Sequence, residues 1–199
     1  MTQEEMSRLL TPYLEGAAVP EGLYAQLGTY LELLTKWNAR TNLTAIREPA
    51  EMVRRHFGES LFAARQLPEC ATLLDFGSGA GFPGLPMQLW RPELGVTLAE
   101  SQNKKATFLR EVCRTLGLKT EVWAARVEGM AAGREFDVVA LRAVDNMEVA
   151  LAAARVRARR GMVVLTTARA WLEVEGFAVE ASIRLPGSVD GVVVAARRG

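Results

Sequence analysis

The segment from Leu73 to Gly84 constrains the fold more than any other part of the chain. It passes from an apolar run into a glycine-rich turn, and a short helix is expected directly after it, over residues 85–90. A strand, a glycine turn and a helix in this order are typical of the first βα unit of a nucleotide-binding α/β domain. Glycine has no Cβ, so its backbone can turn tightly and lie directly against a ligand. The segment therefore predicts a ligand site at the end of a sheet strand.

Two ligand classes fit the glycines of this turn. The spacing Gly79-x-Gly81-x-x-Gly84 matches the dinucleotide fingerprint, which predicts a nicotinamide-dependent oxidoreductase. In that fingerprint a helix N-terminus with free N–H groups lies under the pyrophosphate. Pro83 and Pro86 have no N–H group and remove two of those donors. The match is incomplete, and an NAD-dependent oxidoreductase is kept as the alternative hypothesis.

The same turn also follows the pattern Asp75-x-Gly77-x-Gly79-x-Gly81, an acidic residue followed by alternating glycines. A carboxylate at the tip of a strand repels a pyrophosphate and attracts a cation. S-Adenosylmethionine carries a sulfonium and an ammonium group and has no phosphate. The position of Asp75 therefore favours S-adenosylmethionine as the cofactor, with Asp75, Gly77 and Gly79 at its binding site.

Composition limits the class of protein. A chain of 199 residues, 49% of them hydrophobic, is expected to form one compact unit, with at most a small appendage. Lysine and arginine number 24 against 23 for aspartate and glutamate, so any nucleic acid has to bind a local patch. Cys70 and Cys113 fit buried thiols in a reducing compartment better than a disulfide. The chain has no apolar run of membrane-spanning length, and residues 1–5 do not resemble a signal peptide, so we expect a cytoplasmic protein without membrane contact.

The first third of the chain predicts an α-helical cap over residues 1–68. Apolar residues recur at helical spacing, and helices are expected over 2–15, 21–38 and 49–67. Pro49 suits the first turn of the third helix, and Pro68 ends that helix. Residues 38–44 break the helical period and are rich in side-chain hydrogen-bonding groups, which predicts a loop.

Residues 69–199 alternate between strand and helix patterns, which predicts an α/β domain with a mostly parallel sheet. Asn103 is expected to cap the helix that follows the second strand, and Gly117 to close it. Strands are expected from residue 71 and over 94–100, 119–124, 136–141 and 161–166, and an antiparallel pair over 174–183 and 189–196. This order matches the class I S-adenosylmethionine-dependent methyltransferase architecture, a Rossmann-like seven-stranded sheet with an antiparallel C-terminal strand.

Polar residues follow several of the predicted strands, at the edge where ligands bind in such sheets. Glu100 ends the second strand, where its carboxylate can accept hydrogen bonds from the two ribose hydroxyls of a nucleoside. Arg126-Val127-Glu128 follows the third strand and is placed to hold an adenine edge, although a plain carboxylate at a helix start explains Glu128 equally well. Arg142 follows the fourth strand, where its guanidinium group could pair with a ligand carboxylate or with an RNA phosphate.

Missing motifs narrow the chemistry. The chain lacks the Asn/Asp-Pro-Pro-aromatic tetrapeptide of amino-group methylases, and neither cysteine follows a late strand, where a C5 nucleophile would be needed. One histidine cannot build a Cys/His metal cluster, so no metal is expected. The remaining class of acceptor is a ring nitrogen such as guanine N7, whose lone pair needs only alignment with the sulfonium and exclusion of water.

Several motifs in this order resemble the RsmG family, also called glucose-inhibited division protein B. These proteins methylate guanine N7 in small-subunit (16S) ribosomal RNA. The resemblance covers residues 20–165 and rests on Trp37-Asn38-x-x-x-Asn42-Leu43-Thr44, Arg55-His56-x-x-x-Ser60-Leu61, Asp75-x-Gly77-Ser78-Gly79-Ala80-Gly81-Phe82-Pro83-Gly84-x-Pro86, Glu100-Ser101, Lys104-Lys105-Ala106-x-Phe108-Leu109, Arg126-x-Glu128, and Asp137-x-Val139 to Arg142-Ala143.

The resemblance implies a role for particular residues. It places Gly77, Phe82, Val127, Glu128 and Arg142 against S-adenosylmethionine. It places the His56 segment and the Lys104-Lys105 pair on the side of the RNA, which would be ribosomal RNA or the small ribosomal subunit. No catalytic residue is assigned, and Arg142 and His56 are the candidates. The protein is expected to be a monomer.

Some basic residues have a second interpretation. His56 shares a helix face with apolar residues, so a packed, hydrogen-bonded histidine competes with a role at the RNA or cofactor. Arg54 and Arg55 either contact phosphate or are solvated helix charges. Arginines 155, 157, 159 and 160 precede Gly161, where they are expected to complement a helix C-terminus.

The sequence departs from the family pattern in three places. Glu59 stands where the family usually has an aspartate. The Lys-Gly expected after the fifth strand is replaced by Thr166-Thr167-Ala168-Arg169, and the linker that follows is short. These differences on the ligand side lead to a third hypothesis, a non-catalytic RNA-binding relative.

Overall fold

A computed structural model describes residues 1–144, 146–167 and 174–199. Its helical segments are α1 (Gln3–Leu14), α2 (Leu23–Thr41), α3 (Pro49–Glu51), the π-helix η1 (Met52–Gly58), α4 (Glu59–Ala64), α5 (Gly84–Trp90), α6 (Asn103–Thr115), the 3-10 turn η2 (Val127–Gly129) and α7 (Met147–Arg155). Its strands are β1 (Thr72–Phe76), β2 (Gly95–Ala99), β3 (Glu121–Trp123), β4 (Phe136–Arg142), β5 (Ala158–Thr167), β6 (Phe177–Arg184) and β7 (Gly191–Arg198).

The strands form one seven-stranded sheet in the order β3-β2-β1-β4-β5-β7-β6. Strands β1 to β5 pair in parallel, and β7 runs antiparallel to both β5 and β6. This arrangement confirms the predicted fold class. The order reverses at β1, because the chain moves outward from β1 to β3 and then returns to β4 on the other side. Ligands bind beside such a reversal, at the carboxyl ends of the strands.

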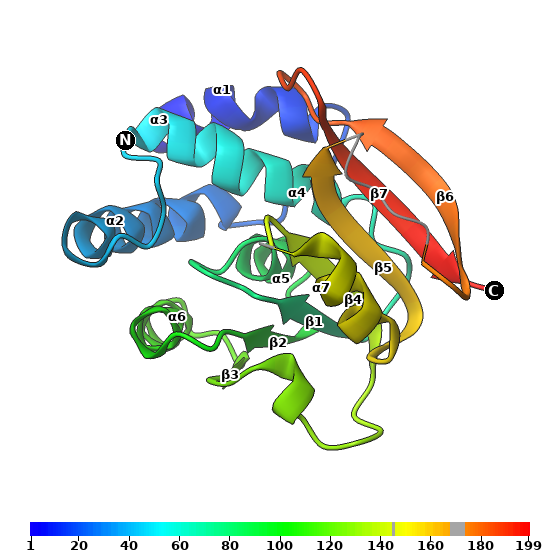
Figure 1. Cartoon of the computed structure of the whole chain (residues 1–199). Coiled ribbons are helices and arrows are strands. Elements are labelled where there is room, and N and C mark those ends of the chain that lie inside the picture. The colour runs from blue at the N-terminus through cyan, green and yellow to red at the C-terminus, as the bar shows by residue number, and fades with distance from the viewer. Residues whose placement is uncertain (145, 168–173) are drawn as a thin grey trace.

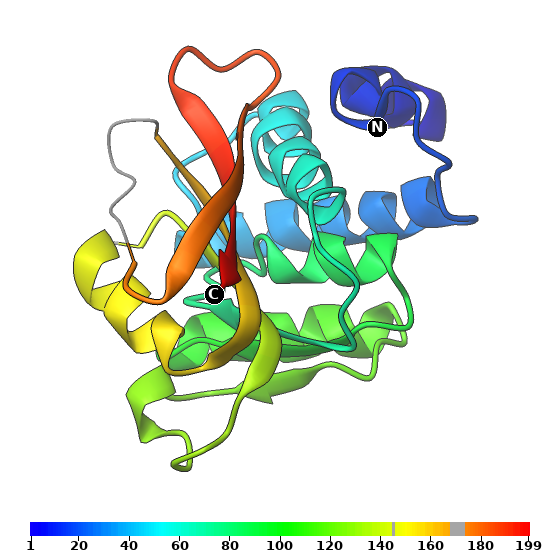
Figure 2. The same ribbon diagram turned by 90° about the vertical axis from the view of Figure 1, so that its right-hand side faces the viewer.

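Both faces of the sheet are covered by helices (Figure 1). Alternate residues of β4 separate the two layers of core: Val138 and Ala140 pack with the N-terminal helices and α5, whereas Val139 and Leu141 pack with α7. Figure 2 shows α7 on one side of the C-terminal strands and the N-terminal helices on the other. A strand that is apolar on both sides is the pattern expected for a buried parallel sheet.

The N-terminal helices share one core with the sheet. Leu10 of α1, Leu27 of α2 and Phe57 of η1 are buried in the same cluster as Leu85 of α5 and Val138 of β4. The helical character of residues 1–68 is confirmed by these elements, whereas the division into a cap and a sheet domain at residue 68 stays a prediction. In the described part of the chain, no helix combines the length and the apolar character needed to span a membrane.

Three local predictions were wrong. Helix α2 continues to Thr41 instead of ending at Asn38, because the Asn38 side chain turns inward and bonds to the backbone of Thr44 and Ile46. Asn103 is the first residue of α6 and does not cap it; the N-cap position is Gln102, which makes no side-chain cap bond. Finally, α7 ends at Arg155 and β5 begins at Ala158, so Arg159 and Arg160 lie on a strand and not at a helix terminus.

The two cysteines are unpaired, as expected. Cys113 is buried in α6, whereas Cys70 is only half-buried just before β1. Gly117 has a φ of +67° immediately after α6, which confirms its predicted role at the end of that helix.

We predict that alanine substitutions at two helical glycines will have opposite effects. A Cβ on Gly84 would lie 2.7 Å from Asp75 Cβ and from Leu98 Cδ2, so Gly84→Ala should lower the free energy of unfolding by about 1–3 kcal/mol. A Cβ on Gly28 in α2 meets no atom within 4 Å, so Gly28→Ala should raise it by about 0.5–1 kcal/mol. Urea unfolding of both variants tests this. Equal changes in the free energy of unfolding in the two variants would contradict the tight packing of α5 on β1.

Candidate functional site

The glycine loop between β1 and α5 is held by its own backbone. The N–H of Ser78 donates to Ala99 O, at 2.9 Å, and those of Gly81 and Phe82 both donate to Ser78 O, at 2.7 and 3.0 Å. The N–H of Leu85 donates to Gly81 O at 2.9 Å. These amides already have acceptors within the protein and are not directed at a ligand. The loop therefore offers a shaped surface and not a cradle for phosphate oxygens.

Two buried carboxylates complete this network. Asp75 Oδ2 accepts from the N–H of Gly84 at 3.0 Å, and Glu100 Oε2 accepts from the N–H of Gly79 at 2.9 Å. Glu100 Oε1 also accepts from the N–H of Gln102 at 2.7 Å. Thus Asp75 fixes the end of the loop from beneath, and Glu100 ties the loop to the end of β2.

Asp75 is fully buried, and its second oxygen, Oδ1, has no hydrogen-bond partner among the described residues. Burial raises the pKa of this carboxyl from 3.8 to about 7, although the bond from Gly84 works in the opposite direction. The side chain lines neither of the two cavities described below. Its predicted contact with a ligand stays a prediction, and its contacts here are those of a residue that supports the loop.

Two cavities open at the carboxyl ends of β1, β2 and β4. The first, of about 370 Å³, is lined by the glycine loop together with His56, Glu100 and Arg142. The second, of about 260 Å³, is lined by residues at and after the ends of β1, β2 and β3, including Val127 and Glu128 of η2. Gly77 lines both, with a φ of +73°, and a Cβ there would lie 3.3 Å from Val144, which also lines both cavities. Gly77 and Val144 thus lie at the boundary between the two cavities.

A column of aromatic rings backs the first cavity. The ring of His56 stacks on Phe82, with centroids 4.8 Å apart and planes inclined by 19°. Phe82 in turn stacks on Tyr30 at 5.4 Å and 7°. Tyr30 is fully buried, and its hydroxyl donates to the carbonyl of Ala80 in the glycine loop. The column thus joins η1, the glycine loop and α2.

Arg142 is nearly buried beside this column. Its Nη2 donates to Glu59 Oε2 at 2.8 Å and to the carbonyl of Arg55 at 2.6 Å. Its Nη1 lies 3.2 Å from His56 Nδ1. Both terminal nitrogens therefore have partners within the protein, and the predicted pairing with a ligand carboxylate or a phosphate stays a prediction.

These contacts fix the protonation of His56. Arginine can only donate, so Nδ1 of His56 accepts and carries no proton. Nε2 then carries the proton and donates to Thr44 Oγ1 at 2.7 Å. Burial, reinforced by the positive charges of Arg142 and Arg55, lowers the pKa of His56 from 6.5 to about 3. The imidazole is neutral at physiological pH.

The basic residues expected near RNA do not form one cluster. Lys105 lines the first cavity, and Lys104 beside it is exposed. Arg54 pairs with Glu51 at the helix surface, and Arg55 pairs with Glu59 and is more than half exposed. The structure brings His56, Lys105 and Arg142 together around the first cavity, and the contacts of all five predicted basic residues with RNA remain predictions.

Sequence reasoning missed two features of this site. Glu59 was noted only as a departure from a family pattern, yet its buried carboxylate bridges Arg55 and Arg142. The π-helix η1, which presents His56 and is followed by Glu59, was expected to be ordinary α-helix. A π turn shifts the residues after it around the helix axis, and such turns are common at functional sites. The Arg55-His56 motif was the available signal, because it gathers polar residues on a helix otherwise packed in the core.

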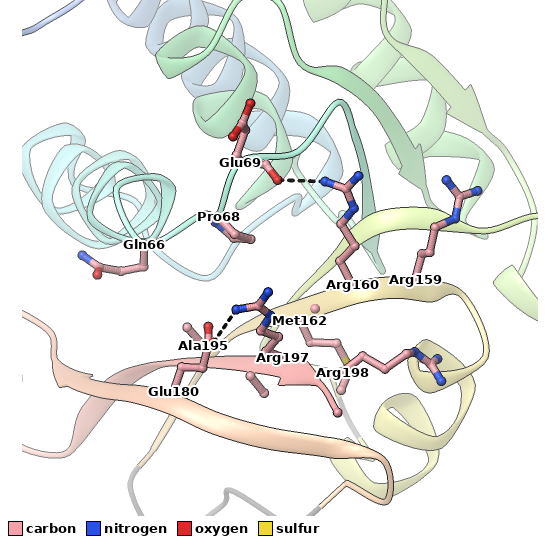
Figure 3. Close-up of a pocket in the computed structure, with 13 residues that line it drawn as sticks. Gln66, Pro68, Glu69, Arg159, Arg160, Met162, Glu180, Ala195, Arg197 and Arg198 are labelled. Atoms are coloured by element: carbon pink, nitrogen blue, oxygen red, sulfur yellow. Dashed lines mark hydrogen bonds and ion pairs between the residues drawn. The ribbon is translucent and has the colours of Figure 1, made fainter.

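A further cavity, of about 620 Å³, lies at the opposite end of the sheet and is lined by Arg159, Arg160, Arg197 and Arg198 (Figure 3). Each guanidinium group already has a partner. Arg160 donates to Glu69 O, and Arg197 lies 3.5 Å from Glu180. Arg159 lies 3.7 Å from Asp137, and Arg198 donates to Ala158 O. None of the cofactor-binding or RNA-binding residues predicted from the sequence lines this cavity, so the candidate site is at the glycine loop.

Comparisons with known proteins show which family the chain resembles. The family model described as rRNA small subunit methyltransferase G (GidB) matches residues 23–190. The "Ribosomal RNA small subunit methyltransferase G" of Alkalilimnicola ehrlichii is 47% identical over 129 residues, which are 64% of this chain and 58% of that protein. Its namesake from Xanthomonas campestris pv. campestris is 41% identical over 144 residues, 72% of this chain and 68% of that protein.

The chain thus spans less than two thirds of the length of the first of these relatives. Among solved structures, a "SAM dependent methyltransferase from Aquifex aeolicus" aligns with a TM-score of 0.60 and 15% identity, over 80% of this chain and 98% of that one. At this identity the similarity shows the fold alone.

We predict that Glu59→Gln will destabilise the protein far more than Glu51→Gln. Removing the Glu59 charge leaves the nearly buried Arg142 without its carboxylate, at a cost of about 3 kcal/mol. The matched control, Glu51, pairs with Arg54 on the same helical segment, but those side chains are 47% and 43% exposed, so the change should be under about 1 kcal/mol. Urea unfolding measures both. Similar losses of unfolding free energy in the two variants would show that burial does not make the Glu59–Arg142 pair more important for stability than the Glu51–Arg54 pair.

The single histidine gives a direct test of its charge. In the folded protein, the ¹⁵N and ring-proton NMR signals of His56 should stay those of the Nε2–H tautomer from pH 8 to pH 5. Because the pKa is lower in the folded than in the unfolded state, the stability that this difference contributes is present above pH 6.5. It is lost progressively as the pH falls toward 3. A folded-state titration midpoint near 6.5 would contradict the buried, Arg142-bound ring, and unfolded protein at the same pH is the control.

Proposed function

The chain belongs to the rRNA small subunit methyltransferase G (GidB) family, and from this premise we propose that it transfers a methyl group from S-adenosylmethionine to N7 of a guanosine in 16S ribosomal RNA. The observation that carries the proposal is the pair of neighbouring cavities that share Gly77 in their lining, at the point where the strand order reverses. An elongated nucleoside with an amino-acid tail fits such a pair, with one part in each cavity. The residues present are compatible with that cofactor.

The second cavity is suited to the adenine, and the ribose is placed toward Glu100 of the first cavity. Val127 provides a buried apolar contact, and Glu128 an exposed carboxylate, at the end of β3. Glu100 lies at the edge of the first cavity and is buried, with both of its oxygens already bonded to backbone N–H groups. Each carboxylate oxygen has a further lone pair, so Glu100 can still accept from a ribose hydroxyl. We propose that Gly77, Gly79, Phe82, Glu100, Val127 and Glu128 hold the cofactor, with Asp75 supporting the loop beneath it.

The loop amides argue against the alternative, a nicotinamide-dependent oxidoreductase. A dinucleotide pyrophosphate is bound by free N–H groups at the start of the helix. Here Gly79, Gly81 and Gly84, the glycines of that fingerprint, all donate to acceptors within the protein. The family membership points the same way.

The chemistry requires alignment more than acid or base. When bound, the cofactor supplies a methyl group on a sulfonium, and the lone pair of guanine N7 accepts it as the sulfur–carbon bond breaks, with no proton to remove. The chain's task is therefore to hold the base against the first cavity and to exclude water. Phe82 and Leu43 supply apolar lining there, and Lys105 is placed to attract the RNA backbone. Consistent with this, the neutral His56 and the engaged Arg142 are not positioned as a general base.

We propose that the partner is ribosomal RNA or the small ribosomal subunit, and that the protein works as a monomer in the cytoplasm, where ribosomes are assembled.

The missing Lys-Gly after β5 is the basis of the third hypothesis, a non-catalytic RNA-binding relative. Thr166 and Thr167 end β5, whereas Ala168 and Arg169 lie outside the described residues.

The purified protein, given labelled S-adenosylmethionine and small ribosomal subunits from cells lacking this methylation, should incorporate label into 16S RNA. Digestion and mass spectrometry should identify 7-methylguanosine. Labelling of another position would contradict the proposed acceptor. Cofactor binding without labelling of either naked RNA or subunits would support the non-catalytic hypothesis instead.

Glu128→Gln gives a test of the cofactor site that does not depend on RNA. It should raise the dissociation constant for S-adenosylmethionine about tenfold, because a charge-assisted hydrogen bond is lost. Glu148→Gln is the control, since Glu148 is exposed in the first turn of α7 and lines neither cavity. Isothermal calorimetry measures both constants. Equal affinities in the two variants would remove Glu128 from the proposed site.

A further inference from the structure

His56 has a single ring surface left for a ligand. Its Nδ1 faces Arg142 and its Nε2 faces Thr44, so both polar positions on the edge of the ring are occupied. One face of the ring covers Phe82. The side chain nevertheless lines the first cavity and is only partly buried. What remains to contact a bound molecule is the outer face of the imidazole.

From this arrangement we propose that the outer face of His56 is the platform on which the target guanine stacks, so that the base continues the column Tyr30–Phe82–His56. The proposal rests on the proposed function, because it names the contact that the substrate base makes at that site. In this proposal His56 positions the target guanine and neither donates nor accepts a proton in the reaction. The class of ligand that the platform selects is a planar aromatic ring.

The column is built to hold such a platform still. Tyr30 and Phe82 are nearly parallel, at 7°, and Tyr30 is fully buried. Phe57 packs against both rings at 5.1 and 5.4 Å. The two hydrogen bonds of His56 prevent rotation of its ring within the stack. A rigid surface loses little conformational entropy when a base stacks on it.

The neutral charge state of His56 also supports its role as a stacking platform. N7 methylation leaves the guanine ring with a positive charge, and the cofactor that donates the methyl group is itself a cation. A protonated imidazole beside them would repel both. Arg142 and burial keep His56 neutral, as its lowered pKa indicates. A neutral ring can therefore contact the substrate and the cationic product without that repulsion.

The second cavity is the less suitable place for the target base. It is lined by Val127 and Glu128, which the proposed function assigns to the adenine of the cofactor, and the described residues that line it include a single aromatic ring, Phe76. The first cavity contains both Phe82 and His56. The two cavities meet at Gly77, so a base on His56 and an adenine beside Val127 would lie on opposite sides of the transferred methyl group.

Three substitutions separate stacking from hydrogen bonding. His56→Phe keeps an aromatic face and loses both hydrogen bonds, His56→Gln keeps polar atoms and loses the ring, and His56→Ala loses both. Base–aromatic stacking contributes about 1–3 kcal/mol per base, equivalent to about 5- to 150-fold. We expect kcat/KM for the RNA substrate to fall at least tenfold in His56→Gln and His56→Ala and less than threefold in His56→Phe. The dissociation constant for S-adenosylmethionine should change less than twofold in all three, and circular dichroism checks that each variant folds.

A spectroscopic test needs no methyl transfer. Because His56 is the only histidine, its Cδ2 and Cε1 proton signals can be followed without ambiguity. With S-adenosylhomocysteine present at saturation to occupy the cofactor site beside Val127, guanosine should shift these signals upfield through its ring current. Ribose, which has no base, should leave them in place.

The two tests distinguish the failure of each proposal. Upfield shifts with guanosine in a protein that does not methylate RNA would keep the stacking platform and overturn the proposed function. Methylation of guanine N7 that His56→Ala leaves unchanged would keep the proposed function and overturn the platform. A His56→Gln variant as active as the wild type, with His56→Phe impaired, would assign His56 a hydrogen-bonding role and also overturn the platform.

Discussion

The site depends on two buried carboxylates that hold the glycine loop against the sheet. Asp75 accepts the N–H of Gly84, and Glu100 accepts the N–H of Gly79, so the loop is fixed within its first half and at its end. A carboxylate buried without a counter-charge is costly, and the pKa of Asp75 rises to about 7 as a result. Such a cost is retained where it fixes a local geometry. Here the geometry is a loop in which the amides of Ser78, Gly79, Gly81 and Phe82 donate to acceptors within the protein, and whose outer surface is left for a ligand.

That loop also positions the aromatic column. Phe82 belongs to the loop, and Tyr30 bonds to the Ala80 carbonyl two residues earlier, so a helix of the N-terminal segment is attached directly to the glycine turn. His56 is then placed on top of Phe82 by η1. The helical segment before the sheet is thus part of the site. A sheet domain of this kind without α2 and η1 would keep every residue that lines the second cavity, whereas the first cavity would lose His56 from its lining and Phe82 would lose its contact with Tyr30.

The parts of this structure that the sequence predicted are those set by local pattern. Strand positions, the glycine loop and the place of Glu100 and Arg142 at strand ends follow from periodicity and from the rules of parallel sheets. The contact between Arg142 and Glu59 joins residues 83 positions apart, so it cannot be predicted from the periodicity of the sequence. The π turn was missed because its apolar residues still recur at nearly helical spacing. Asp75 shows a different limit, since an acidic residue before glycines indicates charge at the loop but not whether the carboxylate faces the ligand or the core.

Glu59 illustrates how a departure from a family pattern is accommodated. One oxygen of its carboxylate reaches Arg55, four residues earlier in the chain, and the other reaches Arg142 at the end of β4. Arg142 then also binds the carbonyl of Arg55, which closes a small ring of contacts between η1 and the sheet. An aspartate is one methylene shorter, so at this position it could keep both partners only if η1 moved toward β4. Because His56 lies on η1, such a movement would also change where the ring sits over Phe82. The residue at position 59 therefore bears on the position of His56 as well as on that of Arg142.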